Sequence, residues 1–448
     1  MKNIAIILAS GVGERSGLDI PKQFVKIGGK TVLEHTIAIF DAHPQIDEII
    51  IVTNKNYIDE VKEIANLFQK NICVAEGGET RRESSFKGLC QIKEEDAKVL
   101  IHDAVRPFLN KKIIDNCLEA LDKYDAVYVD VKSADTIIKI NEESLIEDIP
   151  NRNSLRRGQT PQAFKLNVIR QAHEFAIKEK NINVTDDCGL IIKFNLGKVF
   201  VVDGDDYNMK ITYPIDVAIA DKLFQLNTED ANNEDLRGLS DKVIVIFGGT
   251  EGIGKSITEI SEQYKARVYS CSRKTGVDIS DSISVKKFFD SIVQKEGKID
   301  YVINTAGVLN VGKVYERTFE DIQKEININY FGSINVAKNA YEYLKKSCGS
   351  LLLFASSSYT RGRAEYAIYS STKAAIVNLT QALAEEWSVD NIKINVINPQ
   401  RTATQMRLQN FGEEPIESLI TPEKVAKKSL SVLLSDLNGQ VVNVRKDD

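Results

Sequence analysis

The chain opens with a short apolar run that breaks into a glycine loop, and this combination constrains the fold of the first half. Ile4–Leu8 is too short and too apolar for a surface helix, so it predicts a strand buried on both faces, as in a parallel sheet. The loop after it contains Gly11 and Gly13, which lack a Cβ, so the backbone can take a positive φ and approach a polyphosphate. Arg15 and Lys22 add positive charge. We therefore expect a cradle for a nucleoside triphosphate, although no Walker-type Gly-Lys-Ser/Thr follows.

Length and composition indicate the number of domains and exclude several classes of protein. A chain of 448 residues is too long for one typical domain, and 43% hydrophobic with 27% charged residues is ordinary for a globular protein. The net charge of −6 argues against a nucleic-acid partner, and no apolar run approaches the ~20 residues of a membrane span. Six cysteines without a CxxC pair and only four histidines predict free thiols rather than a zinc site. We expect a cytoplasmic protein with no signal peptide and no membrane association.

A polar, acidic stretch at Asn227–Asp241 separates two patterns of alternating strands and helices. This alternation predicts two α/β domains with mostly parallel sheets, at 1–228 and 241–448, joined by a linker at 229–240. The predicted strands are Glu48–Thr53, Val99–Ile101 and Ala126–Val131 in the first half, and Lys242–Phe247, Arg267–Cys271, Tyr301–Ile303 and Leu351–Phe354 in the second.

Two further motifs of the first half suggest contacts with a nucleotide. Gly77–Ser85 reads as a glycine turn that opens onto a helix, where Arg81 and Ser84 could hold a base or ribose; a capped helix with solvated arginines is the simpler interpretation. Asp103 directly follows the strand Val99–Ile101, so it is expected in the crevice at the sheet's edge, where a metal-bound triphosphate would lie.

Together these motifs resemble the cytidylyltransferase family that includes the methylerythritol-phosphate and ribitol-phosphate enzymes, over residues 1–226. The resemblance rests on LASGVGER with PKQ, GGETRRESS, HDAVRP, ADTI, TPQAF, TDD and NMKIT, and Ser10 departs from the usual alanine. It implies that Arg15, Lys22 and Lys210 neutralise the triphosphate of CTP while an acceptor phosphate attacks the α-phosphorus. The implied CTP-binding residues are Leu8, Ala9, Ser10, Gly11, Gly13, Gly78, Arg81, Ser84 and Asp103, with Asp103 also placing Mg²⁺. The implied acceptor-binding residues are Asp135, Thr136, Arg152 and Thr185, although Arg152 alone would read as a surface-loop arginine.

The second half begins with a strand, a glycine turn and a helix start, the arrangement that seats a dinucleotide pyrophosphate. Val243–Phe247 runs into the glycine turn Gly248–Gly254. About 20 residues on, where NAD-specific proteins carry an acid, the chain has Ser272, Arg273 and Lys274. A cationic end of this strand suits the 2′-phosphate, so NADPH is favoured over NADH. An ordinary basic turn is the alternative interpretation.

A tyrosine and a lysine one helical turn apart predict proton transfer in this half. Tyr369 and Lys373 share a helix face, and a neighbouring ammonium lowers the pKa of a phenol. Tyr369 could then protonate a carbonyl oxygen that a serine polarises. Spacing selects Ser356 as that serine, with Ser357 as the close alternative.

Residues 240–448 thereby resemble the short-chain dehydrogenase/reductase family. The resemblance implies that Tyr369 is the acid, that Lys373 binds the nicotinamide ribose, that Asn329 holds a relay water and that Asp278 contacts adenine. The implied NADP-binding residues are Gly248, Thr250, Gly252, Ile253, Gly254, Ser272, Arg273, Asp278, Asn304, Ala306, Gly307 and Lys373. Phe247, Thr305 and Gln400 depart from the usual threonine, asparagine and glycine. Four arginines on the substrate side are either solvated or bind a sugar phosphate: Arg361, Arg363, Arg401 and Arg407.

The fusion narrows the function. It resembles a bifunctional family that reduces ribulose 5-phosphate to ribitol 5-phosphate with NADPH and then transfers CMP from CTP to form CDP-ribitol, for bacterial capsule or teichoic-acid-like polymers. The alternatives are a methylerythritol 4-phosphate cytidylyltransferase fused to a reductase of unrelated substrate, and a nucleotide-sensing module without turnover. Members of both families often associate, so a homodimer is expected by analogy.

Overall fold

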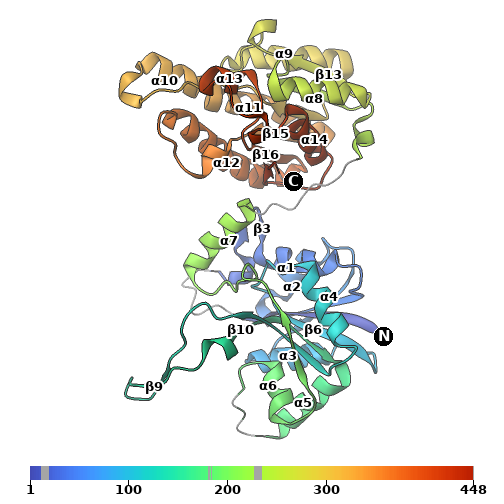
Figure 1. The fold of residues 1–448 in the computed structure, drawn as a ribbon. Coiled ribbons are helices and arrows are strands. Elements are labelled where there is room, and N and C mark those ends of the chain that lie inside the picture. Colours follow the sequence, from blue (N-terminus) through green and yellow to red (C-terminus); the bar gives the residue numbers. More distant parts are fainter. Residues whose placement is uncertain (12–19, 180–181, 183, 227–234, 447–448) are drawn as a thin grey trace. The chain divides into compact units, whose positions relative to one another are not determined.

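The computed structural model describes residues 1–11, 20–179, 182, 184–226 and 235–446. The chain forms two compact units, 1–220 and 221–448, coloured along the sequence in Figure 1. Both are α/β units, which confirms the predicted fold class. In the described part of the chain, no helix has both the length and the apolar character needed to cross a membrane.

The first unit is built on a seven-stranded sheet in the order β11-β7-β10-β6-β1-β4-β5. β1 pairs in parallel with β4 and with β6, and Ile4 to Ile7 have no exposed surface, which confirms the predicted doubly buried strand. β10 is antiparallel to both of its neighbours, so the sheet is mixed. The strands are β1 (Lys2–Ala9), β4 (Glu48–Thr53), β5 (Asn71–Glu76), β6 (Ala97–Asp103), β7 (Ala126–Lys132), β10 (Arg156–Lys165) and β11 (Val199–Asp203).

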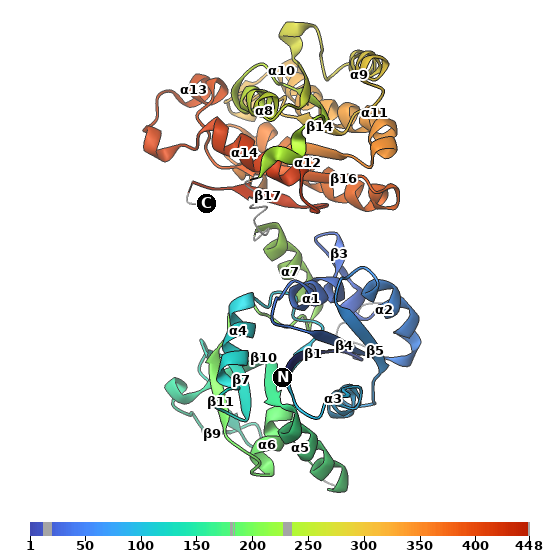
Figure 2. The same ribbon diagram turned by 90° about the vertical axis from the view of Figure 1, so that its right-hand side faces the viewer.

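Helices cover both faces of this sheet, as Figure 2 shows. One face packs against α1 (Val32–Asp41), α2 (Ile58–Ala65) and α4 (Lys111–Ala120), and the other against α3 (Arg81–Leu89), α5 (Leu166–Lys178) and α6 (Asp187–Lys193). α7 (Pro214–Leu226) follows. The predicted glycine turn does open onto a helix, because Thr80 caps α3 by accepting a hydrogen bond from the Glu83 N–H. Such a cap contributes about 1 kcal/mol to helix stability.

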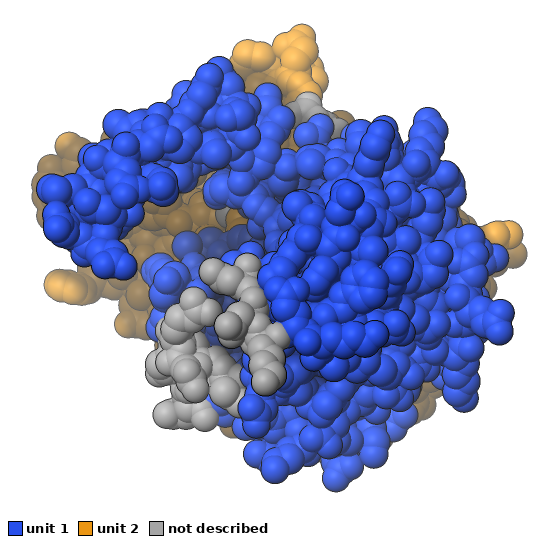
Figure 3. Space-filling view, turned by 90° about the horizontal axis from the view of Figure 1, so that it is seen from below, with its two compact units in different colours: residues 1–220 blue, residues 221–448 orange. Residues whose placement is uncertain are grey.

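A two-stranded arm stands away from the rest of the first unit (Figures 1 and 3). It contains β8 (Lys139–Ile140) and β9 (Ile146–Asp148), which pair antiparallel. A smaller hairpin, β2 (Lys26–Ile27) and β3 (Lys30–Thr31), precedes α1. Six apolar side chains of the arm are 43–60% exposed: Ile137, Ile138, Ile140, Leu145, Ile146 and Ile149.

The second unit is built on a six-stranded, fully parallel sheet in the order β13-β12-β14-β15-β16-β17. Its strands are β12 (Val243–Phe247), β13 (Arg267–Cys271), β14 (Tyr301–Asn304), β15 (Ser350–Phe354), β16 (Lys393–Pro399) and β17 (Val441–Val444). The four strands predicted from the sequence are confirmed to within one residue at each end. The chain turns to opposite sides of β12 to form β13 and β14, so the carboxyl end of β12 lies at the switch point where such sheets bind ligands.

The helices of the second unit again form two layers. α9 (Ser282–Glu296), α11 (Gly332–Ser347) and α12 (Ala367–Trp387) cover one face, while α8 (Gly252–Gln263) and α14 (Pro422–Leu433) cover the other. Two shorter helices complete the unit, α10 (Phe319–Ile326) and α13 (Gln405–Phe411). The expected linker lies partly outside the described residues, at 229–234. Of its remainder, Leu236 and Leu239 are buried in the core beside α14.

Candidate active sites

A group of ion pairs surrounds Asp103 at the carboxyl end of β6. Lys210 Nζ donates to Asp103 Oδ2 at 2.8 Å, and Arg81 Nε donates to Asp103 Oδ1 at 3.4 Å. Arg81 Nη1 also donates to Asp187 Oδ2 at 2.6 Å, and His173 Nε2 lies 3.0 Å from Asp187 Oδ1. Arg81 therefore joins two carboxylates from distant parts of the chain. They lie beside Lys210, which the family resemblance implies as a ligand of the triphosphate.

The two carboxylates stay ionised although they are buried. Burial by itself would raise the pKa of Asp103, but Arg81 and Lys210 hold that pKa well below its usual range. Burial would likewise raise the pKa of Asp187, but Arg81 and His173 lower it to about 2. The site thus carries fixed charges of both signs. Among the described residues, no group of three or more His, Cys, Asp or Glu side chains could hold a metal ion.

Lys22 lies close in space to the segment that carries Lys210. Its Nζ donates to the Thr212 carbonyl at 3.3 Å, two residues beyond Lys210. The neighbouring Gln23 side chain donates to the carbonyls of Ala9, at 2.8 Å, and Gly11, at 3.1 Å, and so holds the start of the glycine loop. Gly11 does not adopt the positive φ that its sequence context allowed. Gly13 and Arg15 lie outside the described residues.

The other predicted CTP-binding residues lie beside this loop. The Leu8 carbonyl accepts from Ala104 N–H at 3.0 Å, which ties the end of β1 to the residue after Asp103. A Cβ on Gly77 would lie 2.0 Å from Ser10 Oγ, so only glycine fits against Ser10 here. Ser84 Oγ accepts from Gly78 N–H at 3.1 Å and donates to the Thr80 carbonyl at 3.0 Å. The glycine turn and the first loop are therefore packed together.

The predicted acceptor-binding residues divide between two places. Asp135, Thr136 and Arg152 are exposed at the base of the arm, and Arg152 Nη1 donates to the Ala134 carbonyl at 3.1 Å. Thr185 is exposed and lines a cavity of about 210 Å³ together with Arg81. Among the residues that the structure describes, no hydrogen bond or ion pair joins these four residues to Lys210.

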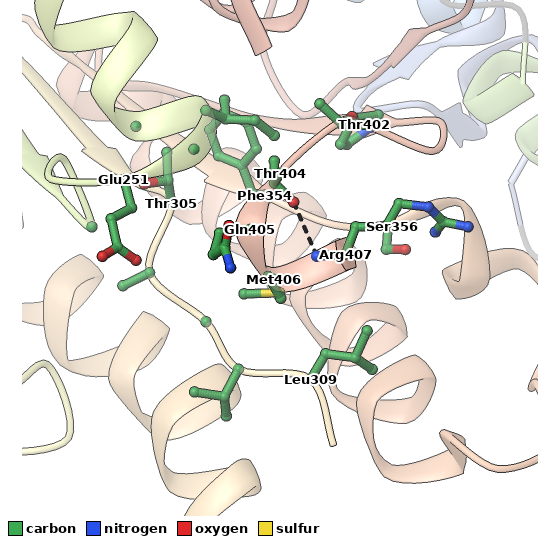
Figure 4. Close-up of a pocket in the computed structure, with 18 of the residues that line it drawn as sticks. Glu251, Thr305, Leu309, Phe354, Ser356, Thr402, Thr404, Gln405, Met406 and Arg407 are labelled. Atoms are coloured by element: carbon green, nitrogen blue, oxygen red, sulfur yellow. Dashed lines mark hydrogen bonds between the residues drawn. The ribbon is translucent and has the colours of Figure 1, made fainter. Parts of the chain in front are cut away.

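The second unit contains a cavity of about 630 Å³ at the switch point of its sheet. Figure 4 shows Glu251 of the glycine turn on one side of it and Arg407 of α13 on the other, with Ser356 also lining it. Besides Ser356, twelve residues predicted to bind NADP or to react line this cavity: Gly248, Thr250, Gly252, Ile253, Gly254, Ser272, Arg273, Asp278, Ala306, Gly307, Tyr369 and Lys373.

The glycine turn requires a glycine at Gly248, and polar side chains lie at the cavity after the next strand, β13. Gly248 has φ of 80°, and a Cβ there would lie 2.7 Å from Ala306 N, so a side chain would strain the turn and collide with the loop after β14. The Ser272 hydroxyl is buried without a hydrogen-bond partner in the described part of the chain, and Arg273 lines the cavity beside it. An unpaired buried hydroxyl next to a guanidinium fits a ligand phosphate. Lys274 instead pairs with Glu251.

Tyr369 and Lys373 lie one turn apart near the start of α12. Burial raises the pKa of Tyr369 to about 12, although a hydrogen bond with Ser356 acts in the opposite direction. The lowered pKa expected for a phenol beside Lys373 is therefore wrong, because burial of the phenol outweighs it. Burial lowers the pKa of Lys373 to about 8, and its Nζ donates to the Phe354 carbonyl at 2.8 Å. At neutral pH the phenol is therefore protonated and can donate, and most of the lysine is charged. Of the two candidate serines, Ser356 is the one that interacts with Tyr369.

Two buried asparagines support the cavity from behind rather than lining it. Asn329 lies in a π-helical turn, where its side chain accepts from Val308 N–H at 2.8 Å and donates to the Val308 carbonyl at 2.9 Å. Asn304 accepts from Ala306 N–H at 3.2 Å. Both therefore hold the loop after β14, and Asn304 has no surface on the cavity.

Three carboxylates at these sites were assigned no role from the sequence. Asp187 belongs to the TDD motif, so a signal was present. Glu414 pairs with Arg407, and the fully buried Glu325 pairs with Arg317 Nη1 at 2.6 Å. Neither Glu325 nor Glu414 lies in a recognisable motif, because each partner is found only after the chain has folded.

Two family models match the chain in tandem. One, described as 2-C-methyl-D-erythritol 4-phosphate cytidylyltransferase, matches residues 3–226. The other, described as enoyl-(acyl carrier protein) reductase, matches residues 241–443.

Individual relatives match either one half of the chain or both halves. The bifunctional ribulose 5-phosphate reductase/CDP-ribitol pyrophosphorylase Bcs1 of Haemophilus influenzae is 46% identical over 454 residues, covering 99% of this chain and 96% of its own. The 2-C-methyl-D-erythritol 4-phosphate cytidylyltransferase of Thermobifida fusca is 36% identical over 49% of this chain and 92% of its own. Among solved structures, 4-diphosphocytidyl-2C-methyl-D-erythritol synthase from Anaerococcus prevotii is 35% identical, with a TM-score of 0.46 over 50% of this chain and 98% of its own.

Proposed function

Because this chain belongs to the family of bifunctional ribulose 5-phosphate reductase/CDP-ribitol pyrophosphorylases, we propose that its two units act in succession on one five-carbon skeleton. The second unit reduces ribulose 5-phosphate to ribitol 5-phosphate with NADPH. The first transfers CMP from CTP to that product and releases pyrophosphate. The observation that carries this function is the 46% identity that extends across both halves of a bifunctional relative.

In the reductase, we propose that Tyr369 donates a proton to the carbonyl oxygen while Ser356 polarises the same oxygen. NADPH supplies the hydride when bound. The pKa of about 12 supports this role of Tyr369, since the phenol holds its proton at neutral pH. Lys373 would contact the nicotinamide ribose, and Asn329 would hold a relay water behind the cavity, since it does not line the cavity itself. The unpaired Ser272 hydroxyl and Arg273 support binding of the 2′-phosphate, which favours NADPH over NADH.

In the cytidylyltransferase, we propose that Arg15, Lys22 and Lys210 stabilise the charge that builds on the phosphates as the acceptor oxygen attacks. The ion pair of Lys210 with Asp103 supports this assignment, because it orients the ammonium before substrate binds. Asp103 is also the candidate ligand for Mg²⁺. A single carboxylate suits this ion, which otherwise takes phosphate oxygens and water in nucleotide sites.

Several finer assignments accompany this function. We propose that residues 1–228 and 241–448 are the catalytic domains, which limited proteolysis within 229–240 would test. We also propose a cytoplasmic homodimer that supplies CDP-ribitol for a surface polysaccharide. The six exposed apolar side chains of the arm support self-association, which sedimentation equilibrium would measure.

The test is a single incubation with CTP, NADPH, Mg²⁺ and ribulose 5-phosphate, followed by mass spectrometry for CDP-ribitol. Omitting NADPH should stop product unless ribitol 5-phosphate is supplied. A product independent of both would refute the coupling. Adding 2-C-methyl-D-erythritol 4-phosphate tests the alternative acceptor, which should lose the competition, and release of pyrophosphate excludes a binding module without turnover.

A further inference from the structure

The reductase cavity extends beyond the cofactor residues into a group of arginines. Arg363, Arg401 and Arg407 line it, together with Glu414. Arg361, two residues before Arg363, is exposed and does not line the cavity. The structure therefore divides the four arginines of the sequence analysis into three that face the cavity and one that does not.

One of these arginines is held in a defined orientation. Arg407 Nε donates to Glu414 Oε2 at 2.6 Å, and Arg407 Nη2 donates to Glu414 Oε1 at 2.8 Å. The guanidinium also lies over the Phe411 ring, 4.5 Å from its centroid. A guanidinium has five N–H donors in a fixed plane, so this bidentate pair leaves the Nη1 edge available to another anion.

The other two arginines keep most of their charge available. Arg401 Nη1 lies 3.8 Å from Glu414, beyond hydrogen-bond distance. No described side chain pairs with the Arg363 guanidinium, although the Arg363 N–H donates to Ser370 Oγ at 3.4 Å. With three guanidinium groups and one carboxylate, this part of the cavity has a net charge of +2, which matches a dianion.

Aromatic packing joins the two segments that supply these arginines. The Tyr366 ring packs edge-on against the Phe411 ring, with centroids 5.8 Å apart. Tyr366 occupies the N-cap position of α12, three residues before Tyr369, and Phe411 ends α13. The loop of Arg363 and the helix of Arg407 are thus held together next to the proposed proton donor.

We infer that Arg363, Arg401 and Arg407 form the site for the phosphate ester of the sugar that the reductase acts on, with Arg407 oriented by Glu414. The inference rests on the proposed reductase function and adds the residues that select a phosphorylated substrate. The 2′-phosphate of NADPH is a second phosphate ester, but Ser272 and Arg273 are the groups placed for it, at the end of β13.

The test compares Arg363→Met and Arg407→Met with the matched control Arg361→Met in the full-length enzyme. Oxidation of NADPH is followed at varied ribulose 5-phosphate, and NADPH affinity is measured separately by its fluorescence. Loss of a charge-assisted contact to phosphate should raise the KM for ribulose 5-phosphate by about 10- to 100-fold in the first two variants. Inhibition by ribitol 5-phosphate should weaken by the same factor. The Arg361 variant should match the wild type in both measurements.

The outcomes separate this inference from the function on which it rests. If the wild-type enzyme does not oxidise NADPH with ribulose 5-phosphate, the proposed function is wrong. If it does, and Arg363→Met has an unchanged KM, the phosphate site is wrong. A loss of NADPH affinity in the Arg363 and Arg407 variants, without a change in ribitol 5-phosphate inhibition, would also overturn it. Arg363→Lys keeps the charge and should restore most of the affinity if the variants are folded.

Discussion

Replacing Arg81 with methionine should destabilise the first unit, because two buried carboxylates would lose their shared partner. Removing one member of a buried ion pair costs about 3–5 kcal/mol. Asp187 would keep His173 at 3.0 Å and Asp103 would keep Lys210 at 2.8 Å, so the lower value of about 3 kcal/mol applies. The pKa of Asp187 agrees with this figure. A fall from 3.8 to about 2 corresponds to about 2–3 kcal/mol of stabilisation of the folded state.

The assay must separate the two units. Trp387 is the only tryptophan and lies in the second unit, so its fluorescence in urea reports that unit alone. Hydrogen exchange of peptides from α3 and β6 reports the first unit. We expect faster exchange in these peptides of Arg81→Met, and a midpoint of thermal unfolding lower by about 6–12 °C for a unit of this size. The Trp387 transition should stay unchanged.

The pH dependence gives a second check with a fixed sign. Both carboxyl pKa values are lowered in the folded protein, so their stabilisation is fully present above about pH 4 and is lost as the pH falls toward 2. The first unit of the wild type should therefore become no more stable than that of Arg81→Met as the pH falls through that range. Arg82→Met is the control, since no described carboxylate pairs with Arg82. Equal stability of the Arg81 and Arg82 variants at pH 7 would refute the reasoning.

Four further outcomes follow from the sites. Lys210→Met should slow pyrophosphate release roughly 10²- to 10³-fold without changing NADPH oxidation, and an equal loss of both rates would point to misfolding instead. Tyr369→Phe should abolish NADPH oxidation, yet it should still form CDP-ribitol from supplied ribitol 5-phosphate; retained reduction would remove Tyr369 from the mechanism. Because burial lowers the pKa of Lys373 to about 8, NADPH affinity should fall as the pH rises through that value, and a flat profile to pH 10 would contradict it. The charge of Glu325 raises the pKa of Tyr369, so Glu325→Gln should move the alkaline fall in the reduction rate to lower pH.

Helices, strands and turns that depend on residues close together in the sequence could be predicted from the sequence. β1, β4, β12 and β13 were expected from short apolar runs, and the start of α3 from its glycine turn and cap. The pair of Tyr369 and Lys373 was also evident, because a spacing of four residues places two side chains on one helix face. The positive φ expected at Gly11 was not found, although Gly248 and Gly252 in the second glycine turn do adopt it.

The pairings that decide the chemistry of both sites could not be obtained in this way. Lys210 meets Asp103 across 107 residues, and Arg81 meets Asp187 across 106. Arg363 and Arg361 are only two positions apart, yet only Arg363 lines the cavity. This difference likewise depends on which side chain the folded loop turns toward the cavity.

The sequence by itself therefore determined the two α/β units, their glycine turns and the residue types available at each site. Backbone propensity, capping and hydrophobic periodicity act over a few residues, and one chain records them directly. Only the tertiary structure decided which distant charges meet. An ion pair depends on distance and burial, and packing of the sheets and helices sets both.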